Sequence, residues 1–249
     1  MMLLDYIEKL NECMSVEAVW AHHTAAMKEY GFNRMLYGFT RSLSANSYGD
    51  REDIMLLTTH TEEYMKAFID GGLYYDATMV KWATENVGAK SWGMIAENAD
   101  KMNEAERAVL ELNVAHQITA GYSISFKEIS SKAKGAIGMV SSPDMTQAET
   151  DEMWADCGRD ITQMCNMAHL KLGALPYASP KRNLTSRQRE VLEWVGDGKT
   201  IQDIATIMGL TGATVEKHLR LARESLDVET TAQAVLKASF HNQIFILPN

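Results

Sequence analysis

The apolar and polar residues of the first 173 positions follow two different periods. Apolar residues recur at three- or four-residue spacing in the longer segments, which predicts helices with one buried face over residues 3–10, 16–30, 62–70, 104–119 and 146–172. Shorter segments bounded by Gly, Ser or Asn read as strands, over residues 34–39, 54–58, 122–129 and 135–142. The last two strands are separated by a Ser-Ser-Lys turn, which is a hairpin signal.

Strands in hairpins with helices before and after them favour a layered fold with an antiparallel sheet. We therefore predict an α+β first domain, an α-β-α sandwich over residues 1–173. Two of the four prolines, Pro176 and Pro180, follow its last helix and predict a linker over residues 174–183. Residues 184–249 then form a second domain.

The second domain carries helix start signals. Three threonines are each followed three positions later by a residue that can complete a capping box: Thr185 with Gln188, Thr200 with Asp203, and Thr230 with Gln233. Thr211 begins a fourth helix after a short Gly209-Leu210 turn, a spacing typical of helix-turn-helix units. We predict an all-α domain of four helices.

The helix after Thr211 has a face suited to DNA. If Val215, Leu219, Ala222 and Leu226 face the core, the opposite side presents small and basic side chains that fit a major groove. The expected DNA contacts, including flanking basic residues and amides at the helix start, are Arg187, Lys199, Thr211, Ala213, Thr214, Lys217, Arg220 and Leu221. A helical cap with a solvated basic face is the alternative.

Composition and charge support this division. The chain is 46% hydrophobic and 23% charged with 3 Cys, which excludes a disordered chain and a disulfide scaffold. The formal net charge is -9, yet nine of the 24 basic and only eight of the 33 acidic residues lie from Lys181 onward. An acidic body would thus carry a unit that binds a polyanion. Without a membrane span or leader pattern, we expect a cytoplasmic protein.

The second domain resembles a known family. The stretches LTSRQREVLEWV (184–195), GKTIQDIA (198–205) and TVEKH (214–218) are similar to the LuxR-type helix-turn-helix, and the likeness extends through most of residues 184–240. Ser225 and Thr231 depart from it where basic residues are usual. The resemblance implies a transcription regulator that binds double-stranded DNA.

Residues 60–92 carry the candidate ligand chemistry. His60, Tyr64 and Phe68 are four positions apart and so share one helix face. After Gly71-Gly72 come further aromatic, hydroxyl and carboxylate side chains, namely Tyr75, Asp76, Thr78, Met79 and Trp92. Large apolar walls with few polar groups are typical of a small-molecule pocket. An aromatic core beneath an exposed carboxylate is the alternative, and no histidine has a partner at metal-ligand spacing.

The first domain resembles the autoinducer-binding domain of quorum-sensing LuxR-type regulators. The resemblance rests on Tyr64, Phe68, Asp76, Trp92 and Gly121, and it implies an N-acyl-homoserine lactone ligand but no cofactor or metal. By this analogy Asp76 accepts the ligand amide N–H and Tyr64 donates to the lactone carbonyl. Ser141 or Thr78 bonds the acyl amide carbonyl, Trp92 and Met79 line the ring and chain, and Ser123 offers another hydroxyl.

Several positions depart from that pattern. Tyr64 replaces the usual Trp, Phe68 the usual Tyr, and Ala77 the Pro that usually follows the Asp. A polar ligand group that loses its buried partner costs binding free energy, so such changes alter ligand preference.

The resemblance further implies a homodimer that reads an inverted repeat and acts on RNA polymerase. A regulator of this type that is ligand-independent, senses another small molecule or pairs with a protein partner stays open. An enzyme is disfavoured, because no nucleophile, metal cluster or carboxylate pair has catalytic spacing.

Overall fold

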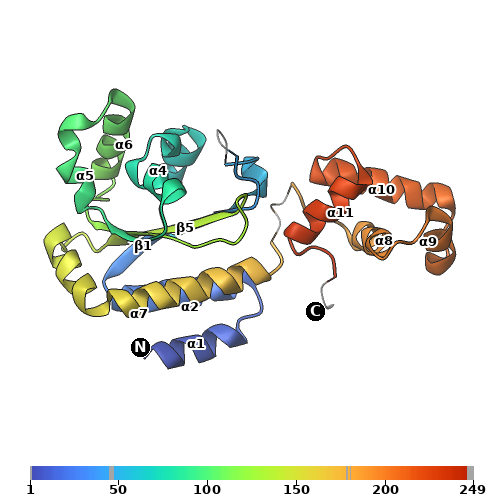
Figure 1. Cartoon of the computed structure of the whole chain (residues 1–249), viewed down its shortest axis with the longest axis horizontal. Helices are drawn as coiled ribbons and strands as arrows, with labels where there is room; N and C mark the ends of the chain where they lie inside the picture. Colours follow the sequence, from blue (N-terminus) through green and yellow to red (C-terminus); the bar gives the residue numbers. More distant parts are fainter. Residues whose placement is uncertain (1, 45–47, 178, 180, 246–249) are drawn as a thin grey trace. The chain divides into compact units, whose positions relative to one another are not determined.

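The computed structural model describes residues 2–44, 48–177, 179 and 181–245, and the chain divides into two compact units (Figure 1). The first unit comprises Met1–Gly49 and Leu56–Gly173. The second comprises Ala174–Asn249 and, in addition, the short segment Asp50–Met55. The first unit ends at Gly173, and the inclusion of residues 50–55 in the second unit is something that nothing in the sequence pattern indicated.

One antiparallel sheet organises the first unit. Its strands are β1 (Phe32–Thr40), β2 (Met55–Thr58), β3 (Gly88–Ser91), β4 (Gly121–Ser125) and β5 (Lys134–Ser141). They follow the order β2-β1-β5-β4-β3, which places β5 in the middle. Gly138 of β5 lies between Leu36 of β1 and Ser123 of β4. Because side chains alternate along a strand, these neighbours share one face of the sheet.

The opposite face is sealed by α1 (Leu3–Glu12), α2 (Val16–Glu29) and α7 (Gln147–Ala174), which lie together in Figure 1. On α7, the Trp154 indole stacks on Tyr122 of β4 with ring centroids 3.9 Å apart. Tyr37 of β1 donates or accepts a hydrogen bond at His169 Nδ1 on α7, over 2.9 Å. The core of the first unit therefore lies between the sheet and these three helices.

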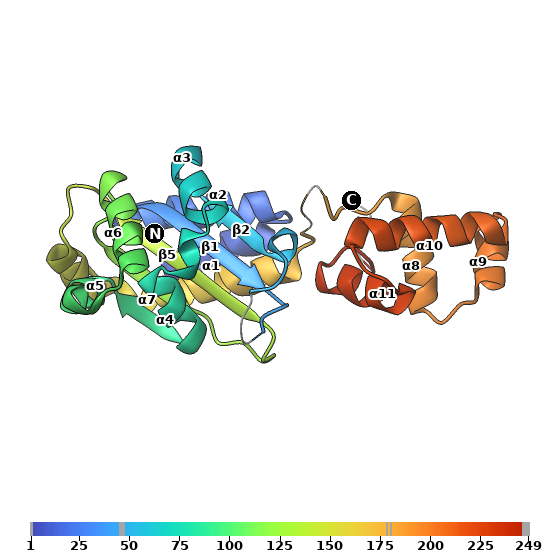
Figure 2. The ribbon, with the colours of Figure 1, turned by 90° about the horizontal axis from the view of Figure 1, so that it is seen from above.

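Shorter elements cross the other face of the sheet (Figure 2). They are α3 (Glu62–Met65), η2 (Lys66–Asp70, a π-helical turn), η3 (Leu73–Tyr75), α4 (Thr78–Glu85), α5 (Gly93–Glu97), η4 (Ala99–Lys101) and α6 (Glu104–Ala115). The α-β-α sandwich is thus confirmed. The elements α4, β3 and α5 had not been predicted, and the strand expected over residues 122–129 ends at Ser125. Beyond it the chain leaves the sheet, and Glu128 reaches His169 at 2.8 Å.

The second unit contains α8 (Ser186–Gly196), α9 (Ile201–Met208), α10 (Gly212–Leu226) and α11 (Thr231–Phe240). All three predicted capping boxes form, at Thr185, Thr200 and Thr230, and Thr211 caps α10 by accepting from the Thr214 amide. Gly209 ends α9 with a φ of 64°, a left-handed conformation that glycine adopts without strain. The helical fold of this domain is confirmed.

Candidate functional site

An aromatic ladder stands over the less covered face of the sheet. The rings of His60 and Tyr64 stack with centroids 4.6 Å apart, and those of Tyr64 and Phe68 stack at 5.3 Å. The predicted common face is therefore present, although the helix changes to a π-helical turn at Lys66. The Tyr64 hydroxyl donates to Asn113 Oδ1 on α6 over 2.9 Å, and burial raises the pKa of Tyr64. Asn113 fixes the ladder against α6.

His60 begins the ladder with an unsatisfied atom. Its Nδ1 is buried, and among the described residues it finds no hydrogen-bond partner. Burial, with Arg34 and His116 adding to it, lowers the pKa of His60 to about 4, so the imidazole is neutral at pH 7. A buried ring nitrogen without a partner is costly unless something binds to it.

The predicted carboxylate Asp76 lies beside a lysine. Lys81 Nζ is 3.2 Å from Asp76 Oδ1 and 3.2 Å from Glu106 Oε1. Burial alone would lower the pKa of Lys81, but its hydrogen bonds to Glu106 and Asp76 outweigh this and raise it. The Asp76 side chain is 41% exposed. The candidate carboxylate therefore already has a cationic partner in the free protein.

Tyrosine rings border Asp76. Tyr74 and Tyr75 have ring centroids 4.1 Å apart, and Tyr48 lies 5.9 Å from the first and 5.5 Å from the second. Thr78 and Met79 follow in the first turn of α4, where Met79 is buried and Thr78 half-buried. Tyr75, Asp76, Thr78 and Met79 are neighbours along the chain, and of these Tyr75 is 48% exposed.

Trp92 joins this group to the sheet. Its indole Nε1 donates to Ser123 Oγ over 2.9 Å. Gly121 makes room for the ring, since a Cβ there would come within 3.0 Å of it, whereas a Cβ at Gly138 would touch the ring at an ordinary contact distance of 3.7 Å. The predicted Trp92, Ser123 and Gly121 therefore meet in space.

Ser141 does not join them. Its Oγ lies 2.8 Å from Thr150 Oγ1 of α7, and it is buried on the sealed face of the sheet. The reason is strand alternation, which directs residues 137, 139 and 141 of β5 to α7 and residues 136, 138 and 140 to the aromatic ladder. The expected grouping of Ser141 with Ser123 is corrected accordingly.

The two faces of the sheet differ in how completely they are covered. On the face toward α7, Met35, Tyr37, Ile137 and Met139 are at most 2% exposed. On the opposite face, Leu36 and Gly38 of β1 and Ala136 and Gly138 of β5 are half-buried, although Val140 at the end of β5 is only 1% exposed. A Cβ at Gly38 would meet open space. Half-buried apolar side chains surround this area, among them Leu36, Tyr74, Val80 and Trp92. Central strands left partly uncovered beneath aromatic walls can accommodate a small apolar molecule.

A second candidate site lies on α10. Its buried residues are Val215, Leu219, Ala222 and Leu226, as predicted. The predicted DNA contacts on this helix lie on the other side: Ala213, Lys217 and Arg220 are exposed, and Thr214 and Leu221 are half-buried. Thr211 is exposed at the helix start, where backbone amides favour an anion.

The flanking basic residues are also exposed. Arg187 on α8 pairs with Glu190 at 2.7 Å, and Arg220 on α10 pairs with Glu224 at 2.6 Å. Both are exposed pairs one helical turn apart, which hold an arginine only weakly in water. Lys199 precedes α9 and is exposed. These cations can therefore turn to a phosphate at little cost.

Sequence reasoning missed Lys81, Asn113 and Tyr48. Asn113 is 49 positions from Tyr64, and no local pattern connects them. Across the described part of the chain, no cluster of His, Cys, Asp or Glu could hold a metal ion. Within the same residues, no helix is both long and apolar enough to cross a membrane.

Comparisons with known proteins cover both sites. A family profile described as "Autoinducer binding domain" matches residues 15–172, and one described as "Bacterial regulatory proteins, luxR family" matches residues 182–238. The chain is 26% identical over 225 residues to the transcriptional activator protein SolR of Ralstonia nicotianae, with 86% of each chain covered.

Two solved structures have a similar fold. SdiA in complex with octanoyl-rac-glycerol superposes with a TM-score of 0.54 at 17% identity, over 96% of this chain and 93% of that one. CepR2 from Burkholderia cenocepacia, described as an N-acylhomoserine lactone dependent LuxR family transcription factor, gives 0.53 at 19% identity, over 68% and 93%.

Proposed function

Because the chain belongs to the LuxR family of quorum-sensing transcription regulators, we propose that an N-acyl-homoserine lactone bound in the first unit controls how it binds DNA. The proposed DNA target is an inverted repeat, bound by a homodimer. The first domain would extend over residues 1–173 and the DNA-binding domain over residues 184–249, with residues 174–183 between them.

The uncovered face of the sheet is the observation that carries the ligand proposal. A regulator with two fully packed layers would offer a small molecule no apolar surface. Here one layer is sealed, while the other leaves Leu36, Gly38 and Trp92 only partly covered below the aromatic ladder. An acyl chain would cover this surface, and each buried methylene would contribute about 0.8 kcal/mol.

Polar groups at both ends of this surface would orient the ligand. Asp76 would accept the amide N–H, Thr78 would donate to the acyl carbonyl, and Tyr64 or His60 would bond the lactone. Met79, Phe68, Tyr75 and Trp92 would form walls, with Ser123 behind Trp92. CepR2, with a similar fold, is described as dependent on an N-acylhomoserine lactone.

Thermal unfolding tests the ligand proposal. Protein made in a host without acyl-homoserine lactones is melted alone and with lactones of increasing chain length. A ligand at 100 times its Kd stabilises the folded state by about 2.7 kcal/mol, which is a visible rise in Tm. A rise that peaks at one chain length supports a lactone receptor, whereas no rise with any lactone would contradict it.

For DNA, we propose that Ala213, Thr214, Lys217, Arg220 and Leu221 of α10 enter the major groove. Thr211, Arg187 and Lys199 would contact phosphates. The support is the exposed basic face of a capped helix within a unit that matches the LuxR family profile. The homodimer would form in part through α11, where Leu236 is 55% exposed. RNA polymerase would be its further partner, and the cytoplasm its location.

A second candidate is a regulator of the same family that senses another small molecule, responds to a protein partner or needs no ligand. In the free protein, Asp76 already pairs with Lys81, and the Tyr64 hydroxyl already donates to Asn113. Both partners would compete with a lactone, which favours this alternative. SdiA, whose fold is similar, is described in complex with octanoyl-rac-glycerol, which is not a lactone. Gel filtration of ligand-free protein separates the two: a stable dimer that binds DNA supports the second candidate.

A further inference from the structure

The second unit includes six residues from the first half of the sequence, Asp50–Met55. Within them, Asp50 caps the short helix η1 (Arg51–Asp53) by accepting from the Glu52 amide over 3.0 Å. Three of the four residues 50–53, which we call the acidic turn, carry carboxylates. Its local hydrogen bonds hold these carboxylates close together.

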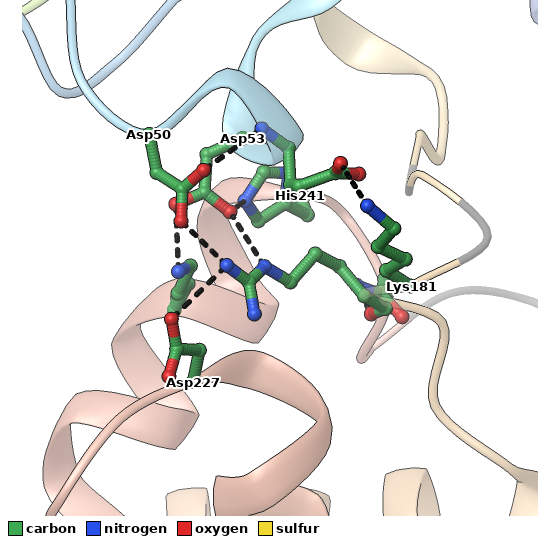
Figure 3. A network of polar contacts seen from close by, with 9 residues as sticks. Asp50, Asp53, Lys181, Asp227 and His241 are labelled. Carbon is green, nitrogen blue, oxygen red and sulfur yellow. Dashed lines mark hydrogen bonds and ion pairs between the residues drawn. The ribbon is translucent and has the colours of Figure 1, made fainter.

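The acidic turn contacts a group of basic residues in the second unit (Figure 3). Asp53 Oδ2 lies 2.6 Å from Lys237 Nζ on α11, and its Oδ1 lies 3.5 Å from His241 Nε2 at the end of that helix. Arg182 reaches Asp50 at 2.5 Å and Asp53 at 3.6 Å. One carboxylate therefore faces three cationic or titratable side chains.

The ion pairs of the acidic turn differ in how far their side chains are buried, and therefore in strength. The side chain of Asp53 is 8% exposed and that of Arg182 11%, so water screens their charges little. Burial would raise the pKa of Asp53, but hydrogen bonds from His241 and Lys237 outweigh this and lower it. By contrast, Lys181, which pairs with Glu52 at 2.8 Å, is 76% exposed. Within the second unit, the acidic turn is therefore held mainly by the contacts of Asp53 and Arg182.

Lys237 and Arg182, the two basic partners of Asp53, link the acidic turn to two helices of the DNA-binding domain. Lys237 lies on α11 itself. Arg182 also contacts Asp227 at 3.2 Å, and Asp227 is the C-cap of α10. A change in the acidic turn would therefore act on the end of the helix that carries Lys217 and Arg220.

The same stretch of chain begins at the candidate ligand site. The Tyr48 ring lies 5.9 Å from Tyr74 and 5.5 Å from Tyr75, the residue before Asp76. Thr40 fixes the Tyr48 backbone by donating to its carbonyl oxygen over 2.8 Å. Only Gly49 separates Tyr48 from the acidic turn, and its φ of 90° is a conformation that other residues rarely adopt. Six consecutive residues thus connect the ligand site to Arg182 and Lys237.

We propose that residues 48–53 are a coupling segment, through which a molecule bound beside Tyr75 and Asp76 changes how the DNA-binding domain is held. This inference rests on the proposed function and adds to it a route of regulation. A ligand that fixes the tyrosine rings fixes Tyr48, and through Gly49 it strengthens the hold of Asp53 on Lys237 and Arg182. Because coupling is reciprocal, DNA bound to the second unit tightens ligand binding by the same factor.

Hydrogen exchange in the ligand-free full chain tests the segment without any ligand. Tyr48→Ala removes the ring contacts but leaves every member of the ion network in place. We expect amides of α11 and residues 241–243 to exchange at least about fivefold faster than in the wild type. Val87→Ala, which truncates a 58% exposed side chain of the first unit, is the matched control and leaves these amides unchanged. Unchanged α11 exchange in Tyr48→Ala, with the sheet still protected, overturns the proposal.

Operator affinity tests the other end of the segment. Asp53→Asn keeps the shape of the side chain and removes its charge, and Glu52→Gln does the same at the exposed pair. The quantity measured is the ratio of operator Kd without and with the lactone that raises the Tm most. We expect Asp53→Asn to bring this ratio at least about fivefold closer to one, and Glu52→Gln to leave it unchanged. Equal weakening in both states would show a structural role alone and overturn the coupling.

Lys237→Met removes the ion pair between Asp53 and α11 from the other side. If Asp53→Asn does not fold, the operator Kd ratio of Lys237→Met is measured in its place. The hydrogen-exchange and operator-affinity experiments also distinguish failure of the lactone proposal from failure of the coupling proposal. If no lactone raises the Tm, the lactone proposal fails, and hydrogen exchange in Tyr48→Ala still decides whether the segment couples the two units. If a lactone raises the Tm but neither the exchange rate nor the ratio responds, only the coupling fails.

Discussion

At the scale of single residues, Lys81 competes with any ligand for the Asp76 carboxylate. The ion pair is half-exposed, with the two side chains 40% and 41% exposed, and such pairs contribute about 0–1 kcal/mol. A ligand amide in a drier environment gains more from a carboxylate, about 1.5–3 kcal/mol. A ligand of the proposed kind would therefore displace Lys81, but it would bind more weakly than to an Asp76 without this partner.

We expect Lys81→Met to tighten lactone binding by up to about fivefold, because it removes the competitor and keeps the length of the side chain. Asp76→Asn should weaken binding by about tenfold or more, since it removes a charged acceptor. Titration of intrinsic tryptophan fluorescence measures both. Lys101→Met, at an exposed lysine of η4, is the control. Weaker binding in Lys81→Met would show instead that the lysine positions Asp76.

His60 makes the stability of the first unit depend on pH. Its pKa falls from 6.5 to about 4 on folding, chiefly because of burial. Between these values the unfolded chain binds a proton that the folded chain does not, so stability decreases as the pH falls from 6.5 toward 4. His60→Phe keeps the stacking on Tyr64 and removes this proton.

We therefore expect urea unfolding of His60→Phe to depend less on pH than that of the wild type. The difference in slope has an upper limit of about 1.4 kcal/mol per pH unit. Stabilities at pH 8, where His60 is neutral in both states, give the baseline for any change in packing. Parallel curves for the two proteins from pH 8 to pH 5 would refute the assignment.

At the scale of elements, local signals explain why the second domain could be predicted and much of the first could not. Helices α8 to α11 are each preceded by a threonine that caps the helix. The signal for each helix start therefore lies within a few residues of it in the sequence. Helix α4 follows Ala77 with no side-chain cap. Strand β3 reads Gly-Ala-Lys-Ser, which has neither β-branched nor aromatic residues, and pairing with β4 holds it at the edge.

The candidate site shows the same limit. The spacing of His60, Tyr64 and Phe68 predicted their shared face, because helical period is local. The face on which Ser141 points depends on the register of β5 between β1 and β4, which short-range pattern does not encode. Asn113 is 49 positions from Tyr64, so only the folded chain brings the two together. Lys81 is five positions after Asp76, but the direction of its side chain depends on helix α4, which the sequence pattern did not predict.

The exposed face of α10 leads to a prediction for DNA binding. Lys217→Ala and Arg220→Ala should each weaken operator binding by about tenfold or more. Each should leave the free energy of unfolding within about 0.5 kcal/mol of the wild type, because both side chains are exposed. Fluorescence anisotropy with a labelled operator measures the affinity. Lys132→Ala removes one exposed positive charge from the first unit and serves as the control. Wild-type affinity in both α10 variants would exclude this helix from the groove.

At the scale of the whole molecule, charge is divided between the domains, and this division is visible in the sequence. The acidic surplus lies before Lys181, and the basic surplus after it marks the DNA-binding domain. The acidic turn departs from this division, because it precedes Lys181 in the sequence but belongs to the second unit. Its three carboxylates pair there with Lys181, Arg182, Lys237 and His241. Asp50 and Arg182 are 132 positions apart, so only the fold shows that they pair.

The proposed homodimer has a geometric consequence for the operator. Two copies related by a two-fold axis read an inverted repeat only if their α10 helices are about 34–36 Å apart, one turn of DNA. A contact between the two α11 helices would fix this distance. Leu236 is exposed on α11, and a glutamate there would face its own copy across the axis.

Leu236→Glu should therefore lower the affinity for the full inverted repeat to nearly that for a single half-site, and leave half-site affinity unchanged. Val87→Glu adds the same charge at an exposed apolar position of the first unit and controls for electrostatic repulsion from DNA. Anisotropy with full-site and half-site duplexes measures both constants, and sedimentation gives the mass of each complex. If Leu236→Glu kept the full-site advantage, the copies would be held by the first unit alone, and the spacing of the half-sites would then tolerate insertions that a contact through α11 forbids.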